Sequence, residues 1–219
     1  MATRLLLAEL LAAYQQRSGT QVRMESVGGV DAARRVQAGD VLDVVVLASD
    51  AIAKLAAAGH VLAGSTVDLV RSGVAIAVRE GTAPVDIGSE EAVRAAVLAA
   101  PSLGYSTGPS GVALAQLFER WGIAAEIQGR IVQAPPGVPV GALVARGEVA
   151  LGFQQLSELL PLPGITVLGP LPPAIQVTTI FSAAVARTSL QPDAVRALLA
   201  FMASPDTAAM KRAQGMDPF

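Results

Sequence analysis

Three hydroxyl side chains follow a short apolar segment near the middle of the chain. Ser106, Thr107 and Ser110 lie within residues 100–121, which read as the end of a strand, a loop of small residues and an amphipathic helix. The first turn of a helix has backbone N–H groups without partners and lies at the positive end of the helix dipole, so it favours an anion. The same residues also serve as ordinary turn and capping residues, and one such loop does not decide between the two interpretations.

Four further turns of the same kind occur along the sequence. Each leads into an expected helix and is rich in small or polar residues: 2–4, 27–30, 137–139 and 153–155, in addition to 106–111. Each can present backbone N–H groups, and together they predict recognition of a small anion mainly by neutral donors. Arg4 and Arg71 are the candidate charge partners. Arg71 stands at a strand end, where a ligand-facing position and a solvated edge are equally compatible with the sequence.

Common catalytic patterns are absent from the sequence. It has neither a Gly-x-x-x-x-Gly-Lys phosphate loop nor a Gly-x-Gly-x-x-Gly motif after a strand, and Gly108-Pro109-Ser110-Gly111 lacks the last glycine of a nucleophile elbow. His60 is the only histidine, and its place after a glycine at a helix end favours a dipole partner or a surface residue. The absence of cysteine removes disulfides, thiolate metal sites and cysteine nucleophiles. Carboxylates do not cluster at metal-ligand spacing, so the sequence predicts neither a metal nor a cofactor.

Length and composition favour a globular α/β protein. The 219 residues suit one large domain or two lobes of about 100 residues each. Hydrophobic residues make up 52% of the chain, yet no apolar run reaches the roughly 18 residues that a membrane span needs. The formal net charge is −2, the basic residues are scattered and aromatic residues are few, which argues against a nucleic-acid partner. The start of the sequence lacks the pattern of a secretory signal.

Strand and helix patterns alternate along most of the chain, which is typical of parallel α/β structure. In such sheets ligands bind outside the carboxyl ends of the strands. The first helix has no strand before it, so the chain either starts inside a longer protein or takes its first strand from elsewhere. Helices are expected at residues 3–17, 31–38, 51–58, 89–100, 140–146, 154–160, 191–203 and 204–213, and a further helix follows the strand at 102–105 and runs to about residue 121. Strands are expected at 21–26, 43–48, 67–78, 102–105, 126–133, 149–153, 165–168 and 177–185.

Several motifs resemble the substrate-binding proteins of ABC transporters, in particular molybdate-binding proteins. They are Gly28-Gly29, the run at 35–48, the loop 105–111, residues 144–148 with Gly152-Phe153, and the tail 215–218. The resemblance covers nearly the whole chain. It implies the type II periplasmic-binding fold of two α/β lobes, each with a mainly parallel sheet flanked by helices, here without its first strand. Residues 74–78 and 181–185 resemble the crossovers. Lobe 1 is then 1–76 plus 184–219, lobe 2 is 77–183, and the ligand lies between them.

The resemblance also implies a set of ligand-binding residues. In lobe 1 these are Thr3, Gly29 and Val30 as donors, with Arg4 and Arg71 as charge partners. In lobe 2 Tyr105 joins Ser106, Thr107, Ser110 and Gly111 around the anion, Val138 offers a backbone donor, and Gln154 and Gln155 offer side chains. Closure of the two lobes on the ligand would be a hinge motion. The expected partners are a small anionic ligand and the membrane component of an ABC transporter, with no nucleic acid and no membrane insertion.

The resemblance leaves two functions open. The first is a non-enzymatic protein that binds an oxyanion such as molybdate, or a di- or tricarboxylate, for transport. The runs Gly-Phe-Gln-Gln-x-Ser-Glu-Leu at 152–159 and Gly-Pro-Leu-Pro at 169–172 also resemble a branch that includes aconitate-isomerase-like proteins. An isomerase needs an acid and a base, for which Tyr105, Glu25 and Glu158 are candidates, with core packing and solvated carboxylates as the alternatives. A sensor lobe is a third interpretation. The resemblance implies a periplasmic location, and a cytoplasmic one if residue 1 is the natural start.

Overall fold

The computed structural model describes residues 2–135 and 137–219. The chain forms two compact units: unit 1 comprises Met1–Ser72 and Thr179–Phe219, and unit 2 comprises Gly73–Thr178. The predicted lobe boundaries, after residues 76 and 183, lie a few residues beyond these divisions. Strand β2 (Val67–Arg79) begins in unit 1 and ends in unit 2, and β7 (Thr178–Val185) begins where unit 2 ends.

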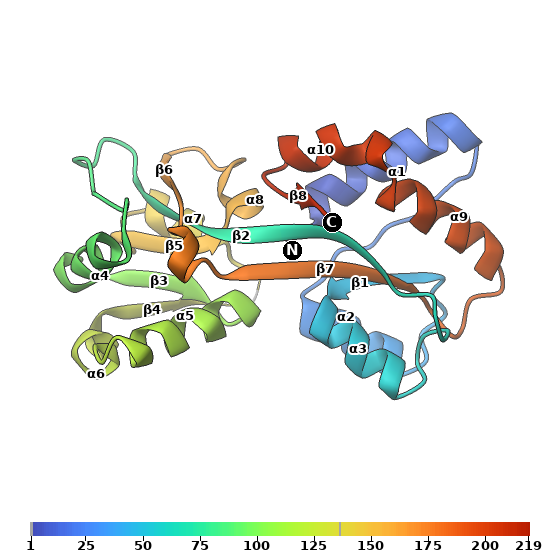
Figure 1. Cartoon of the computed structure of the whole chain (residues 1–219), viewed down its shortest axis with the longest axis horizontal. Helices are drawn as coiled ribbons and strands as arrows, with labels where there is room; N and C mark the ends of the chain where they lie inside the picture. Colours follow the sequence, from blue (N-terminus) through green and yellow to red (C-terminus); the bar gives the residue numbers. More distant parts are fainter. Residues whose placement is uncertain (1, 136) are drawn as a thin grey trace. The chain divides into compact units, whose positions relative to one another are not determined.

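Unit 1 contains helices on both faces of its strands (Figure 1). Strand β1 (Val44–Ala48) pairs with β7 in antiparallel fashion, from Val44 opposite Val185 to Ala48 opposite Phe181. β8 (Asp217–Pro218) pairs antiparallel with the unit 1 part of β2. The helices of this unit are α1 (Arg4–Ser18), α2 (Gly29–Gln37), α3 (Ser49–Ala57), α9 (Pro192–Ala203) and α10 (Ala208–Ala213), with a 3-10 helix at Pro205–Thr207.

Alternating residues of β7 divide the core of unit 1 into two clusters. Ala183 and Val185 pack into a cluster with apolar residues of α1, α9 and β2. Ala184, between them, packs into the second cluster with residues of β1, α2 and α3. Successive side chains of a strand point to opposite faces, so one strand anchors both helical layers. In Figure 1, α2 and α3 are drawn on one side of β1 and β7, and α1, α9 and α10 on the other.

Unit 2 is built around three parallel strands. β3 (Leu103–Ser106) lies between β4 (Ile131–Ala134) and β5 (Leu151–Gln155), and both pairings are parallel. β5 and β6 (Ile165–Pro170) each pair antiparallel with β2. The helices are α4 (Glu90–Ala99), α5 (Pro109–Arg120), α6 (Ala124–Ile127), α7 (Val140–Ala145) and α8 (Leu156–Leu159), with 3-10 helices at Gln128–Arg130 and Pro173–Ile175.

The predicted α/β class is therefore correct, but fewer of the strand pairs are parallel than expected. Strands β4, β3 and β5 of unit 2 form the expected parallel arrangement. In unit 1 the ladder between β1 and β7 is antiparallel, because β7 returns from unit 2 and runs against β1. The parallel neighbour that the pattern predicts for β1 is not formed by the described residues.

Two predicted strands differ from the structure. Residues 21–26 were predicted as a strand from their alternating pattern, but they pair with no strand among the described residues. A segment is assigned as a strand only when its backbone pairs with another segment. Residues 126–133 begin instead as helix α6 and a 3-10 helix, and only Ile131–Ala134 pairs as β4. The predicted helix at 154–160 begins at Leu156, so Gln154 and Gln155 are the last residues of strand β5.

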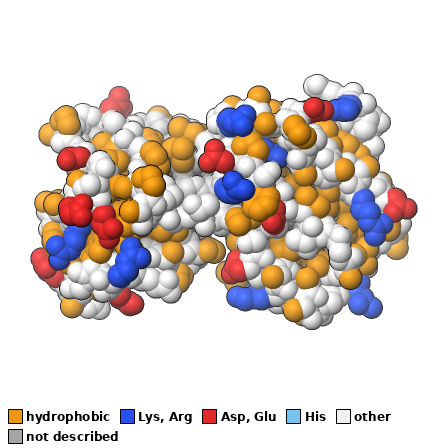
Figure 2. Space-filling view, in the orientation of Figure 1, with side chains coloured by type: hydrophobic (Ala, Val, Ile, Leu, Met, Phe, Trp, Pro, Cys, Tyr) orange, Lys and Arg blue, Asp and Glu red, His pale blue; other side chains and the backbone are white. Residues whose placement is uncertain are grey.

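The described helices are too short or too polar to cross a membrane. Acidic and basic side chains are interspersed on the face shown in Figure 2, with neither sign forming a continuous stripe. This distribution is consistent with the near-neutral net charge of −2.

Candidate anion-binding site

The parallel strands of unit 2 bring the predicted turns of that unit to one edge. Ser106 at the end of β3 is paired with Ala134 at the end of β4, and Gly104 is paired with Gly152 of β5. The carboxyl ends of the three strands therefore meet, and each chain segment continues from there into a helix. The residues of the predicted set that lie at the ends of these strands or just after them are Tyr105, Ser106, Thr107, Ser110, Gly111, Val138, Gln154 and Gln155.

The turn from β3 into α5 is held tightly by a glycine. A Cβ atom at Gly111 would lie 1.7 Å from the carbonyl oxygen of Ser106, so any side chain there must displace backbone. The absent side chain lets the first turn of α5 pack directly on the end of β3. The amide of Gly108 reaches the Ser106 hydroxyl at 3.4 Å, and Pro109 occupies the first helical position, where a missing N–H costs nothing. Ser110 is buried beside Gly111, whereas Thr107 is exposed.

Tyr105 belongs to the core of unit 2 rather than to an open surface. Its side chain is 7% exposed, and its ring lies 6.1 Å from that of Phe118. Burial raises the pKa of its phenol above the usual value. The burial and the contact with Phe118 agree with the core-packing alternative for this ring.

Gln154 is fixed at the end of β5 by contacts on both ends of its amide. Its side chain is 4% exposed, and its Oε1 accepts a hydrogen bond of 3.2 Å from the backbone N–H of Gly141 in the first turn of α7. Its side chain also bonds to the carboxyl group of Glu158 in α8. Burial raises the pKa of the Glu158 carboxyl, and the bond from Gln154 partly offsets that shift. A buried amide therefore links the starts of two helices at this edge.

Ser157 carries a buried hydroxyl without a partner. It lies in the first turn of α8 and is 6% exposed, and its Oγ has no hydrogen-bond partner among the described residues. A buried hydroxyl normally finds a partner, because an unpaired one loses its hydrogen bond to water. Ser157 was not among the predicted ligand-binding residues. The neighbouring side chain of Gln155 is also buried, at 4% exposed.

The backbone donor predicted at Val138 is already used by a turn. Its N–H bonds to the carbonyl oxygen of Pro135 at 3.0 Å. A ligand would have to compete with that bond for the amide. Val138 itself is half-buried and packs against the cluster that includes Val140 and Val144 of α7.

The predicted residues of unit 1 lie at two helix starts. Thr3 precedes α1 and makes no side-chain capping bond, and Arg4 is exposed at the first helical position. Gly29 and Val30 are the first two residues of α2, and Val30 is 75% exposed. A Cβ atom at Gly29 would meet Leu47 of β1 at 3.8 Å, an ordinary contact, so this helix start is not held by a glycine as α5 is.

Arg71 lies on β2 in the unit 1 part of the strand. It is exposed, and its guanidinium carbon sits 4.6 Å from the centre of the Phe219 ring. The register of β2 with β8 places Arg71 opposite Asp217. Stacking on an aromatic ring leaves the edge of the guanidinium able to donate hydrogen bonds.

Neutral donors dominate the chemistry of the unit 2 edge. It offers helix-start amides, buried amide and hydroxyl side chains, and one half-buried carboxyl group with a raised pKa. No group of three or more His, Cys, Asp or Glu that could hold a metal ion occurs among the described residues. Such an edge is suited to binding oxygen atoms of an anion through hydrogen bonds.

Comparison with protein families agrees with this architecture. Residues 1–217 match the family described as bacterial extracellular solute-binding protein. The chain belongs to this family. The match spans both units and every turn discussed above, so the solute-binding fold includes the whole described site.

Individual relatives fall into two groups. An aconitate isomerase from a Pseudomonas species is 38% identical over 216 residues, which cover 96% of this chain and 82% of that protein. The periplasmic molybdate-binding protein of Azotobacter vinelandii has a TM-score of 0.80 at 20% identity, covering 98% of this chain and 95% of that one. The tungstate-binding protein TupA of Desulfovibrio alaskensis has a TM-score of 0.68 at 17% identity, covering 93% and 86%. The two structural relatives establish the type II periplasmic-binding fold alone.

Proposed function

We propose that this solute-binding protein captures a small anion, either an oxyanion such as molybdate or a di- or tricarboxylate, for delivery to the membrane component of an ABC transporter. The observation that carries the proposal is the edge of unit 2, where three strand ends and the long helix α5 meet around neutral hydrogen-bond donors. Within this edge we assign the main contacts to Ser106, at the end of β3, and to Ser110 and Ser157, in the first turns of α5 and α8. We also propose that the residues predicted in unit 1 contact the ligand.

A carboxylate ligand is favoured over a bare oxyanion by one finding. The relative at 38% identity is named for aconitate, and the match covers 96% of this chain. A planar anion with several carboxylate groups presents many acceptor oxygens, which suits a site built from several separate donors. Arg71, with its guanidinium stacked on Phe219, would add a cation with a fixed orientation.

A panel of anions tests the binding proposal. Molybdate, tungstate, sulfate, citrate, cis-aconitate and trans-aconitate are added separately to the purified chain, and the thermal unfolding midpoint is recorded. A ligand that binds only the folded state raises the midpoint, and the rise grows with the logarithm of the ligand concentration once that concentration exceeds the dissociation constant. We expect a rise with at least one of the carboxylates. If none of the anions raises the midpoint at millimolar concentration, the binding proposal fails.

Isomerisation of aconitate is the second candidate function. It rests on the same relative and on Glu158, whose carboxyl is half-buried and has a raised pKa. Moving the double bond requires a base that takes a proton from the methylene carbon, and an acid that returns a proton to the far carbon of the allylic unit. A carboxyl group with a raised pKa is suited to accept and return that proton, so that no net change in protonation occurs.

Ultraviolet absorbance or NMR distinguishes the two candidates directly. In the isomerase interpretation, cis-aconitate is converted to trans-aconitate, and Glu158→Gln abolishes turnover but leaves binding of the substrate measurable. In the transport interpretation, the wild-type chain binds without conversion. An activity that persists in Glu158→Gln would remove this residue from the mechanism.

We also propose an extracytoplasmic location. The family is described as extracellular, and one structural relative is named periplasmic. Fractionation of the host cell, with detection of the chain in the periplasmic extract, tests this assignment.

A further inference from the structure

Residues 171–177 of unit 2 fold back onto the start of that unit's part of β2. This return segment continues the Gly-Pro-Leu-Pro run at 169–172, which the anion site itself does not use. The side chains of Leu171 and Ile175 are buried in the same core cluster as Val74 of β2. Packing therefore holds the return segment against β2, and hydrogen bonds between the two backbones add to it.

The side chain of Gln176 joins the backbone of the return segment to that of β2. Its Oε1 accepts a hydrogen bond of 2.9 Å from the Val74 N–H, and its Nε2 donates one of 3.1 Å to the Leu171 carbonyl oxygen. A Cβ atom at Gly73 would lie 3.2 Å from the amide carbon of Gln176, so the amide lies directly on the backbone of β2. Because both ends of the amide are bonded, its orientation is fixed.

Val74 turns its backbone groups toward the return segment. Besides the bond to Gln176, its N–H reaches the Val177 carbonyl oxygen at 3.1 Å, and its C=O accepts from the Leu171 N–H at 3.0 Å. Neighbouring residues of a strand turn their N–H and C=O groups to opposite sides. The next residue, Ala75, therefore bonds on the other side of β2, where β5 lies.

Ala75 holds the last part of β5, which leads into the candidate site. The register of these two antiparallel strands places Ala75 opposite Gln154. The other side of β5 agrees with this assignment. Leu151 donates its N–H to the Ser102 carbonyl oxygen beside β3, so by alternation Gly152 and Gln154 turn their backbone groups toward β2. The end of β5 is thus fixed by the residue of β2 that follows the contact with the return segment.

We propose that Gln176 is a positioning residue for the anion site of unit 2. Its amide fixes the start of the unit 2 part of β2, and this strand in turn fixes the end of β5, which carries Gln154 and leads to Ser157. The inference rests on the proposed binding of an anion at this edge. Gln176 acts through the two strands rather than by touching the ligand, because both ends of its amide are already bonded.

Burial along this path favours transmission from Gln176 to the site. Val74 and Ala75 are 0% exposed and Gln154 is 4% exposed. A close-packed interior transmits a displacement from one residue to the next, whereas an exposed segment would absorb it in solvent. Loss of the amide bonds at Gln176 should therefore reach the end of β5.

Amide hydrogen exchange on the ligand-free full chain gives the first test. Gln176→Met removes both hydrogen bonds of the amide and keeps a side chain of similar length. We expect the Gln154 amide to exchange about fivefold faster in this variant than in the wild type, and the Gly152 amide, further from the strand end, to change less than about twofold. Gln128→Met is the matched control, because Gln128 is an exposed glutamine of the same unit.

Gln176→Glu separates the hydrogen bonds from the packing. A carboxylate can accept from the Val74 N–H but has no proton to donate to the Leu171 carbonyl oxygen, whereas a protonated carboxyl can do both. The Gln154 amide should exchange faster than in the wild type at neutral pH. The ratio of the two rates should return toward one as the pH falls below the carboxyl pKa, about 4.3 when unperturbed. Gln176→Met should show no such return, whereas a purely steric role would make the two variants alike at every pH.

Isothermal titration of citrate, trans-aconitate and molybdate links Gln176 to the site itself. We expect about fivefold weaker binding to Gln176→Met than to the wild type, and unchanged binding to Gln128→Met. Unchanged exchange of the Gln154 amide in Gln176→Met, or faster exchange with unchanged affinity, overturns the proposal. If the wild type binds none of these anions, the proposed function fails, and the exchange of the Gln154 amide still decides whether Gln176 positions the end of β5.

Discussion

Gly111 determines how closely helix α5 approaches strand β3. A Cβ atom at this position would lie 1.7 Å from the Ser106 carbonyl oxygen and 2.8 Å from its carbonyl carbon. Neither backbone atom can move without shifting the strand end. The donors at this edge are therefore positioned by the absence of a side chain as much as by the hydroxyls beside it.

Replacing Gly111 with alanine should destabilise the chain strongly. We expect Gly111→Ala to lower the free energy of unfolding by about 3 kcal/mol, because the new methyl group forces backbone apart in a packed region. Urea denaturation followed by circular dichroism measures the change. Gly108→Ala is the matched control in the same turn, since a Cβ atom there meets only the Ser106 hydroxyl at 3.5 Å, and it should cost less than about 1 kcal/mol. Equal losses for the two variants would contradict the account.

Glu158 should make stability depend on pH. Burial raises the pKa of its carboxyl in the folded state above the ordinary value of 4.5, so the folded state holds the proton more tightly than the unfolded state. Its contribution to stability is thus fully present below the unfolded pKa and is lost as the pH rises through the folded pKa. Glu158→Gln cannot ionise. The unfolding free energy of the wild type, relative to this variant, should fall as the pH rises through the ordinary value of 4.5 and above it; a rise would show that the shift has the opposite sign.

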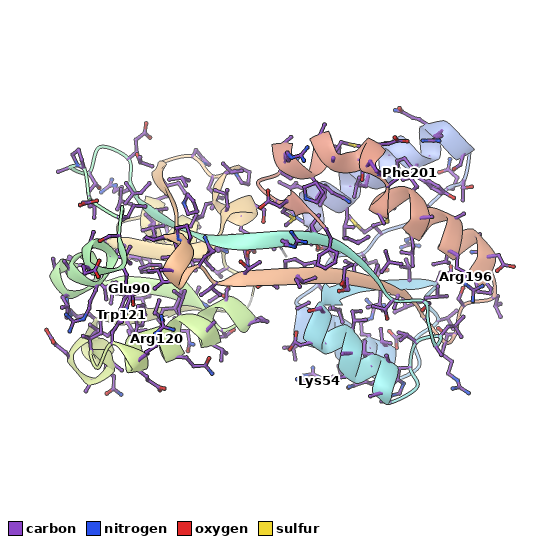
Figure 3. The ribbon with its side chains drawn as sticks, viewed as in Figure 1. Lys54, Glu90, Arg120, Trp121, Arg196 and Phe201 are labelled. Carbon is purple, nitrogen blue, oxygen red and sulfur yellow. The ribbon has the colours of Figure 1, made fainter. Side chains whose placement is uncertain are left out.

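At the scale of elements, α4 and α5 are joined by one hydrogen bond near their exposed ends. The indole Nε1–H of Trp121 donates to Oε1 of Glu90 at 2.6 Å, and Arg120 lies 3.8 Å from the same oxygen (Figure 3). Glu90 is also the first residue of α4, where a carboxylate is favoured by the helix dipole. One side chain thus stabilises its own helix and holds the next one.

Trp121→Phe should lower the unfolding free energy by about 1–2 kcal/mol, because a hydrogen bond to a charged acceptor is lost while most of the ring packing is retained. A double-mutant cycle with Glu90→Ala isolates the bond from the packing. Trp121 is the only tryptophan, so its fluorescence also reports directly on this contact. Additive losses in the cycle would show that the bond contributes nothing.

The elements that the sequence predicted well are those determined by local signals. Helix α4 lies within the expected range 89–100, with the hydroxyl of Ser89 accepting from the Ala92 amide at its start, and β1 and β3 lie within one residue of the expected strands. Residues 21–26 were predicted wrongly because alternation shows that a segment can be a strand, but not whether a partner is present. Residues 126–130 are helical in the structure, whereas a strand was predicted, because Ile127 can be buried from either conformation. Over so short a segment the spacing of apolar residues does not distinguish a helix from a strand.

The candidate site was less accessible from the sequence than the fold. The hydroxyl residues at 106–110 were predicted from their residue type and their position before a helix. Gln154 and Gln155 were predicted because they follow an expected strand. Ser157 could not be found, because its significance depends on a buried hydroxyl lacking a partner, which is a property of packing. For Tyr105 the sequence left a ligand contact and core packing open, and only the structure shows that its ring is buried against Phe118.

At the scale of the whole molecule, membership in the solute-binding family fixes the fold but leaves transport and isomerisation as alternatives. Both require that a small anion bind, and we propose the edge of unit 2 as the place where it binds. Binding is therefore the step on which either function depends, and a variant of Ser157 can test it without disturbing the fold. Removing a hydroxyl that has no partner in the described structure should leave stability unchanged or slightly higher.

Isothermal titration of citrate, trans-aconitate and molybdate into the wild type, Ser157→Ala and Ser204→Ala provides the most direct test. Ser204 carries the other buried hydroxyl without a partner among the described residues, and it lies in unit 1, so it is a matched control. We predict saturable binding of at least one anion to the wild type, about tenfold weaker binding to Ser157→Ala and unchanged binding to Ser204→Ala. Absence of binding to the wild type, or equal affinities for all three proteins, would contradict the account.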